Sequence, residues 1–328
     1  AMANLSAASW GLPAVVLYVT LRYACEGLGQ TVLPMLIAGS TLPVNAALNY
    51  VLIYGVFGLP ELGGEGCGWA TAITMWFELS VMLLVIKRPW LLDTGLLDRF
   101  DWPRFDPMSS IFRVGVPIGL TLFLEMTVFA LISLLVGSIG VTAIGANTIA
   151  GNLNWFVFVI PMSLGSAASI RVGFYVGAKD YQAAAQVARL TIFVSAAYAF
   201  LAFAVLILGR DDLPKIYSSD AEVVALTADL LLIVACYQLF DCTQATLIGI
   251  LRGYKDTKIP MFISWSGYWL LALPVGLILG WGLLGPNWGV LGFWVGLGLG
   301  VAWIAGFALL RVIQTSKNVE KIERFAAV

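Results

Sequence analysis

The chain has 328 residues, of which 60% are hydrophobic and only 11% are charged, and its formal net charge is −1. Soluble domains are about 45–50% apolar and about 25% charged, so this composition indicates a protein that places apolar surface in lipid. The charge balance excludes a basic nucleic-acid-binding surface. The absence of histidine excludes His-ligated zinc or haem, His-based triads and His proton relays.

Nine segments are each long and apolar enough to cross a bilayer, which takes about 20 mostly apolar residues. In chain order they are 9–29, 35–56, 67–86, 113–137, 146–168, 185–208, 222–248, 259–280 and 289–311. The sequence therefore predicts an all-α polytopic membrane protein with about nine transmembrane helices. In the last span, Gly292, Gly296 and Gly300 recur at every fourth position, which predicts close packing against a neighbouring helix.

A polar connector between the third and fourth spans marks a boundary between two blocks. We expect a partial first lobe at 1–86, a cytoplasmic connector at 87–111, a second lobe at 112–314 and a cytoplasmic tail at 315–328. Of the 18 basic residues, only Arg210 and Lys215 lie in connections on the opposite side of the membrane. The positive-inside rule then places the C-terminus in the cytoplasm and, with nine spans, the N-terminus outside.

The sequence also contains an internal repeat. The segment 27–66 aligns with 253–292 without a gap and yields ten identical pairs, such as Pro34 with Pro260. Both copies begin at a cytoplasmic loop, which indicates parallel repeats about an axis along the membrane normal. Spans four to six have no counterpart at the same offset, because it would precede the first residue. We therefore expect a parent of twelve spans in two pseudo-symmetric six-helix bundles, of which this chain carries nine.

Two acidic residues lie at matched depth in the second block. Glu125 follows Arg113 by 12 residues, and Asp241 precedes Arg252 by 11. At 1.5 Å per residue, both carboxylates lie roughly 17–18 Å from the cytoplasmic edge. Charged residues inside a span are costly and are functional-site candidates. Tyr237, one turn before Asp241, shares its helix face.

Two uses of such a pair stay open, because carboxylates can bind Na⁺ through oxygen ligands or can bind protons. The alternative is two separate acids that hydroxyls or water satisfy. Asn152 and Asn154 could reach the same cavity, and aromatic residues such as Phe129 could line a pocket for flat organic cations as well as simply pack. Weaker acidic candidates are Glu78 near the cytoplasmic edge, Asp229 nearer the outside and Asp220 at the mouth of the same helix.

Three segments resemble the multidrug and toxic compound extrusion (MATE) family, in its bacterial NorM-like branch. They are SIRVGFYVGAKDY at 169–181, ILRGYKDTKIPM at 250–261 and NYVLIYGVFGLPELGGEGCGWATAI at 49–73. The resemblance implies two rocking lobes of six spans each, with this chain equivalent to spans 4 to 12. It implies a monomeric, multi-pass protein of the bacterial inner membrane. Such a protein exports organic cations, including drugs and dyes, in exchange for Na⁺ or H⁺ and needs no other cofactor.

The same resemblance implies roles for particular residues. Glu125, Asp241 and Tyr237 match the family's cation site, with Na⁺ expected at the two carboxylates, and Asp220 matches an outer acidic position used for cation or drug binding. From their positions in the sequence we add weaker candidates for substrate binding, namely Phe129, Asn152 and Asn154.

Three other interpretations compete with this one. A lipid-linked sugar flippase of the same superfamily would need a basic central cavity to hold phosphate, whereas the charges in mid-span here are acidic. A membrane-embedded enzyme is disfavoured by the lack of histidine and of zinc motifs. The chain could also be an inactive shortened form of the antiporter, because the family's aspartate in the first span has no position in it.

Overall fold

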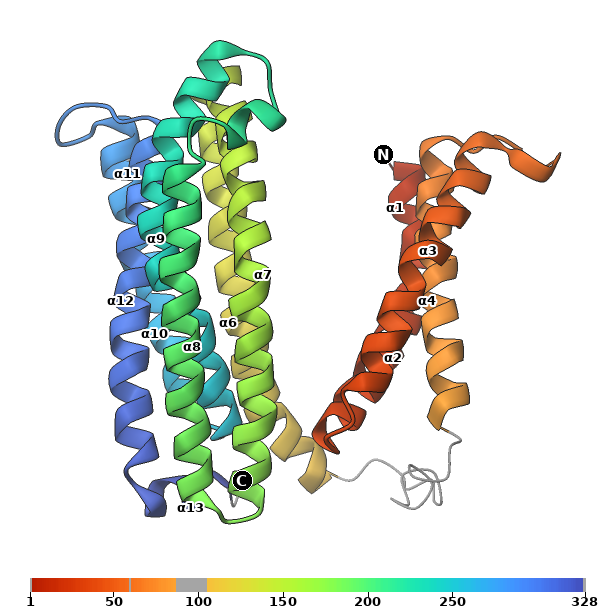
Figure 1. The fold of residues 1–328 in the computed structure, drawn as a ribbon, viewed down its shortest axis with the longest axis vertical. Helices are drawn as coiled ribbons and strands as arrows, with labels where there is room; N and C mark the ends of the chain where they lie inside the picture. The colour runs from red at the N-terminus through yellow and green to blue at the C-terminus, as the bar shows by residue number, and fades with distance from the viewer. Residues whose placement is uncertain (1, 59, 87–104, 327–328) are drawn as a thin grey trace. The chain divides into compact units, whose positions relative to one another are not determined.

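The computed structural model describes residues 2–58, 60–86 and 105–326, and every regular element within them is a helix (Figure 1). The chain divides into two compact units, Ala1–Pro103 and Arg104–Val328. Most of the predicted connector 87–111 lies outside the described residues. Its last part, from Phe105 onward, already belongs to the first helix of unit 2.

Unit 1 contains α1 (Met2–Ser9), α2 (Leu12–Gly27), α3 (Val32–Tyr54), the 3₁₀ turn η1 (Val56–Gly58) and α4 (Gly64–Ile86). Unit 2 contains α6 (Phe105–Gly137), α7 (Val141–Gly177), α8 (Tyr181–Leu208), the 3₁₀ turn η2 (Leu213–Ile216), α9 (Ala221–Gly253), α10 (Lys258–Trp265), the π-helical segment η3 (Ser266–Ala272), α11 (Leu273–Trp281), α12 (Val290–Ser316) and α13 (Val319–Ala326).

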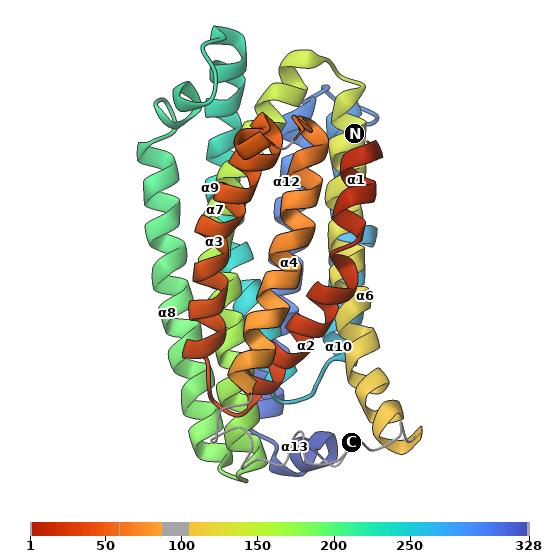
Figure 2. The same ribbon diagram turned by 90° about the vertical axis from the view of Figure 1, so that its right-hand side faces the viewer.

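Eight continuous helical segments of the described residues are long and apolar enough to cross a membrane, and α10, η3 and α11 together form one of them. The predicted span 9–29 differs, because it starts at the last residue of α1, contains a break at Trp10 and Gly11, and continues as α2. The 16 residues of α2 fall short of the about 20 that a span needs. Both helices pack along α4, which lies between them and α3 (Figure 2).

The break between α1 and α2 is stabilised by α4. At the break the backbone carbonyl of Trp10 accepts a hydrogen bond from the indole nitrogen of Trp76, at 3.1 Å. Pro13 stands at the start of α2, where its missing N–H costs nothing. A side chain at Gly11 would collide with Met75. The interruption therefore depends on contacts with a distant helix, which the hydrophobic pattern alone does not report.

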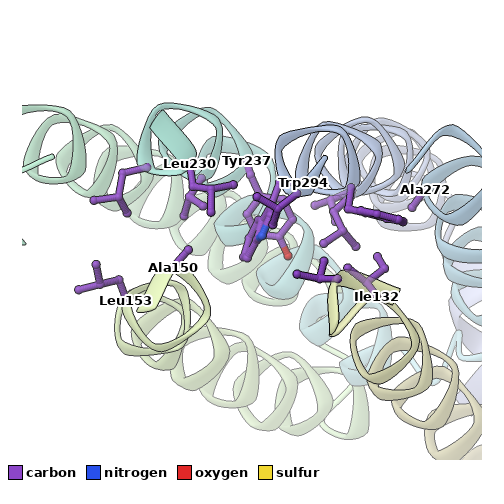
Figure 3. Close-up of a cluster of buried hydrophobic side chains, with 14 of the residues drawn as sticks. Ile132, Ala150, Leu153, Leu230, Tyr237, Ala272 and Trp294 are labelled. Carbon is purple, nitrogen blue, oxygen red and sulfur yellow. The ribbon is translucent and has the colours of Figure 1, made fainter. Parts of the chain in front are cut away.

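The core of unit 2 is built around α9, which packs against α7, α8 and α12. Its largest buried cluster joins α9 to α7 and α12, and Figure 3 shows Tyr237 beside Trp294 within it. The rings of these two residues meet edge to face with centroids 5.9 Å apart. The same helix that carries the candidate acid and tyrosine thus lies at the centre of the packing of the unit.

The predicted close packing at the glycine stripe of α12 is confirmed. A Cβ added at Gly296 would lie 2.5 Å from the carbonyl oxygen of Ala272, and one at Gly300 would lie 2.5 Å from that of Gly267. Gly292 is equally close to the backbone of α11. Only glycine allows the two backbones to approach this closely.

The internal repeat is visible in the helix boundaries. α2 ends at Gly27 and α9 at Gly253, and each is followed two positions later by a left-handed residue, Gly29 with φ 79° and Lys255 with φ 58°. α4 starts at Gly64 and α12 at Val290, which keeps the same offset between the copies. The two copies therefore share their turns as well as their sequence pattern.

The predicted gap-free alignment of the copies is wrong by one position in one stretch. The span that follows the first turn of each copy ends in a left-handed glycine with φ 66° and ψ 34°, at Gly55 and at Gly282. In the gap-free alignment the partner of Gly55 is Trp281, so the second cap comes one position late. The second copy thus holds one extra residue before this cap, and its π-helical segment η3, which has no counterpart in α3, accommodates it.

Candidate functional site

A cavity of about 390 Å³ lies within unit 2, among α6, α7, α9 and α12. Its walls combine aromatic and aliphatic side chains with a few polar groups. Residues lining it include Glu125, Phe129, Asn147, Asn152, Asn154, Trp155, Phe158, Tyr237, Asp241 and Trp294. An apolar cavity with a small number of converging polar groups is typical of a binding site for a small molecule.

Six of the seven residues predicted for the site line this cavity: Glu125, Asp241, Tyr237, Phe129, Asn152 and Asn154. Asp220 does not. It caps the N-terminus of α9, where its side chain accepts hydrogen bonds from the backbone N–H groups of Glu222 at 2.9 Å and Val223 at 3.4 Å. It precedes Asp241 by 241 − 220 = 21 residues of one helix, or about 31 Å.

The weaker acidic candidates also lie outside the cavity. Asp229 is exposed on α9, and Glu78 is half-buried on α4 of unit 1. Of the acids considered from the sequence, the structure brings together Glu125 and Asp241.

Asp241 is the most enclosed of the polar groups. Its side chain is buried, and its Oδ1 atom has no hydrogen-bond donor among the described residues. The hydroxyl of Tyr237, one helical turn earlier, interacts with the same carboxylate. Glu125 lies close enough for its charge to act on Asp241. A buried carboxylate oxygen without a donor is costly, so this atom can accept a proton, a cation or a hydrogen-bond donor.

Glu125 is held from a second helix. Its Oε1 atom accepts a hydrogen bond of 3.1 Å from the hydroxyl of Tyr268 in η3, and Tyr268 is fully buried. The polar wall of the cavity is held in a similar way, because the indole nitrogen of Trp294 donates to Asn147 Oδ1 at 3.0 Å. The site is therefore made of side chains whose orientations are set before any ligand arrives.

The sequence reasoning missed Tyr268, Gln238, Asn147 and Trp294. A signal for Gln238 did exist, since polar side chains recur every three to four positions along apolar α9 and so share one face: Tyr237, Gln238, Asp241 and Gln244. Tyr268 had no such signal. It lies in the π-helical segment, where the 3.6-residue period that sequence patterns rely on does not hold.

The polar groups of the cavity offer oxygen atoms as ligands. The cavity lining holds two carboxylates, a phenol and amide oxygens, and no lysine or arginine is among it. Oxygen donors are the ligands of hard cations such as Na⁺. The described residues contain no group of three or more His, Cys, Asp or Glu side chains placed to hold a metal ion. The aromatic walls can in addition face an organic cation through their rings.

Comparison with known proteins identifies relatives over nearly the whole chain. A family model described as MatE matches residues 117–278, which include every cavity-lining residue except Trp294 and Leu297. A probable multidrug resistance protein NorM of Idiomarina loihiensis is 37% identical over 95% of this chain and 68% of its own length. The multidrug resistance protein MdtK of Photorhabdus laumondii is 36% identical over 98% of this chain and 71% of its own.

Solved structures share the fold. The eukaryotic MATE transporter AtDTX14 is 25% identical and superposes with a TM-score of 0.84, covering 98% of this chain and 71% of its own. The MATE transporter NorM-NG, solved in complex with a dye and a monobody, is 30% identical with a TM-score of 0.69, covering 87% of this chain and 63% of its own.

Proposed function

Because the chain belongs to the MATE family of multidrug transporters, we propose that it exports organic cations in exchange for Na⁺ or H⁺. Like its relatives, it is a membrane transporter and not an enzyme. The exchange would be centred on the cavity of unit 2. The observation that carries the proposal is that two carboxylates, on α6 and α9, face this one mostly apolar space.

Charge is costly to place in such an apolar space. Two carboxylates in one apolar cavity are strongly unfavourable together unless a cation or a proton accompanies them. Na⁺, H⁺ and an organic cation can each neutralise the pair, so their binding there would be competitive. Competition of this kind supports antiport, because binding one cation releases the other.

The aromatic lining favours an organic cation as the exported molecule. Phe129, Trp155, Phe158 and the Tyr237–Trp294 pair offer apolar faces on which a flat cation can lie. The relative NorM-NG was solved with a dye bound. A phosphate-bearing lipid precursor is a poor fit, since the lining has acidic and no basic side chains.

Transport further requires that the cavity open to each side in turn. We propose that the two lobes rock, and that cation affinity differs between the two states, since equal affinity would drive nothing. We also propose a monomer in a bacterial inner membrane with a cytoplasmic C-terminus. In unit 2, the α7–α8 and α9–α10 connections, which carry Lys179 and Lys255, lie at the same end as the C-terminal helix α13 (Figure 1).

Efflux of ethidium, a fluorescent organic cation, from cells that express the full-length protein tests this proposal. Glu125→Gln and Asp241→Asn keep side-chain size but remove the charge, and each should reduce efflux at least about tenfold, a barrier change of about 1.4 kcal/mol. Glu222→Gln serves as the matched control, because Glu222 is exposed on the same helix as Asp241 and outside the cavity. Unchanged efflux in both cavity variants would refute the assignment.

A further inference from the structure

Tyr268 contacts the candidate site from a helix segment that does not line the cavity. Its hydroxyl donates to Glu125 Oε1 at 3.1 Å, and the side chain is fully buried. The side chain of Gln244, on α9, interacts with the same hydroxyl. The phenol therefore bridges the helix of one site acid, Glu125 on α6, to the helix of the other, Asp241 on α9.

The neighbouring residue strengthens this contact. The indole nitrogen of Trp269 donates to the backbone carbonyl of Leu124 at 3.3 Å. Consecutive residues of η3 thus bond to consecutive residues of α6. The pair of bonds fixes both the position of η3 along α6 and the direction of the Tyr268 side chain. A single chance contact would fix neither.

The π-helical geometry has an identifiable origin. Measured against the first repeat copy, the stretch that contains η3 holds one extra residue. In an α-helix one residue corresponds to a rotation of roughly 100°. The wide turn therefore re-aims the side chains within it relative to a regular helix.

α12 holds the wide turn in place. Gly300 lies directly against the backbone of Gly267, so the backbones of α12 and η3 meet at the start of η3 without an intervening side chain. On the same helix, the indole nitrogen of Trp303 donates to Ser266 Oγ at 3.1 Å. Tyr268 is thus supported from behind by glycine packing and a hydrogen bond.

From this frame we infer that Tyr268 is a positioning residue that sets the affinity of the carboxylate pair for the coupling ion. The inference rests on the proposed function of the same cavity. The Tyr268 hydroxyl fixes the orientation of the Glu125 carboxylate and, by its hydrogen bond, stabilises the charged form of this carboxylate. Its loss should change how tightly the coupling ion binds without removing either acid.

The expected shift differs for the two ions. If H⁺ is the coupling ion, loss of the donor makes proton binding tighter, and the pH of half-maximal efflux rises by about one unit. If Na⁺ is the coupling ion, loss of the fixed carboxylate orientation raises the half-saturating Na⁺ concentration about tenfold. A tenfold change in ion affinity is the size expected for the loss of one hydrogen bond to a charged group. In both cases the maximal rate at saturating ion should stay within about threefold of wild type, because both acids are still present.

The test compares Tyr268→Phe with Tyr254→Phe in the full-length protein reconstituted into liposomes. Tyr254 is equally buried, and its hydroxyl has no hydrogen-bond partner among the described residues, but it belongs to a separate cluster away from the cavity. Ethidium efflux is measured over a range of Na⁺ concentrations and of pH. Tyr254→Phe should match wild type in both profiles.

Each outcome decides the inference. A shifted ion profile in Tyr268→Phe alone supports it. An unshifted profile overturns it, as does a loss of maximal rate at an unchanged half-saturating concentration, which would indicate a structural role. If wild type itself shows no cation-driven efflux, the proposed function fails and the inference falls with it. If wild type transports and both tyrosine variants behave alike, only the inference is overturned.

Discussion

Gln238 on α9 donates from its side-chain nitrogen to Asn154 on α7, both to the side-chain oxygen at 2.9 Å and to the backbone carbonyl at 3.1 Å. Both residues are buried. The two bonds join the helix that carries Asp241 to the polar wall of the cavity. Buried polar groups of this kind are costly to leave without a partner.

Substitution of Gln238 by Met should therefore destabilise the protein. Met keeps the volume but leaves the Asn154 side chain without its donor, at a cost of about 1–3 kcal/mol. Thermal unfolding in detergent should show a lower midpoint than wild type. Gln186→Met is the control, because Gln186 is exposed on α8 and should tolerate the change. Equal midpoints for the two variants would contradict the assigned role.

A second prediction concerns the end of unit 2 that carries α13. Arg311 Nε lies 2.6 Å from Asp256 Oδ2, and Asp256 is only 3% exposed. Breaking a buried ion pair leaves an uncompensated charge, at a cost of about 3–5 kcal/mol. Arg311→Met should thus lower the unfolding midpoint strongly.

The double variant Asp256→Asn/Arg311→Met removes the stranded charge and should recover much of that loss. Nearby on α13, burial and the charge of Arg311 lower the pKa of the Lys321 amine, whereas the charge of Asp256 raises it. Asp256 thus also attracts Lys321, and the double variant removes that attraction. Recovery should therefore be partial. A double variant less stable than Arg311→Met would argue against the pair as the source of the stability.

A third prediction separates two glycines on one helix. At Gly300 a Cβ would lie 2.5 Å from the carbonyl oxygen of Gly267, whereas nothing lies within 4 Å of a Cβ at Gly298. Gly300→Ala should push α12 away from η3 and lower the unfolding midpoint, since overpacking costs about 1–3 kcal/mol. Gly298→Ala should be neutral or slightly stabilising, because alanine favours the helix. Similar midpoints for both would show that the close approach is not important.

The fourth prediction assigns Asp220 a capping role. Asp220→Ala removes the acceptor for two backbone N–H groups at the start of α9 and should cost about 1 kcal/mol, whereas Asp220→Ser keeps a cap and should cost less. Because the residue lies about 31 Å along the helix from Asp241, neither variant should shift the Na⁺ or pH dependence of efflux. A shifted Na⁺ or pH dependence in both variants would show that Asp220 contributes to cation binding.

The membrane fold could be predicted from the sequence because it depends on composition and segment length, which are local properties. The Glu125/Asp241 pair was accessible for a similar reason, since depth follows from the distance along the chain to a flanking arginine. The break at Gly11 was not accessible, because Trp76 and Met75 on another helix stabilise it.

The π-helical segment shows the second limit. The second repeat copy, 253–292, has one extra residue in its first span and one residue fewer in the loop that follows. The identical pairs at both ends of its alignment with 27–66 are therefore kept. Only the left-handed caps at Gly55 and Gly282 reveal it. Tyr268 lies in that stretch, so its contact with Glu125 could not be read from helical periodicity.

Equilibrium binding of ethidium to the purified full-length protein tests the central claim most directly. Binding is followed by fluorescence while Na⁺ is raised at constant ionic strength and, separately, while pH is lowered. We expect at least one of the two cations to displace the dye from wild type, and we expect this response to be lost in the Glu125→Gln/Asp241→Asn double variant. Dye binding that does not change with either Na⁺ or pH, or displacement that persists in the double variant, would contradict competition at the carboxylate pair.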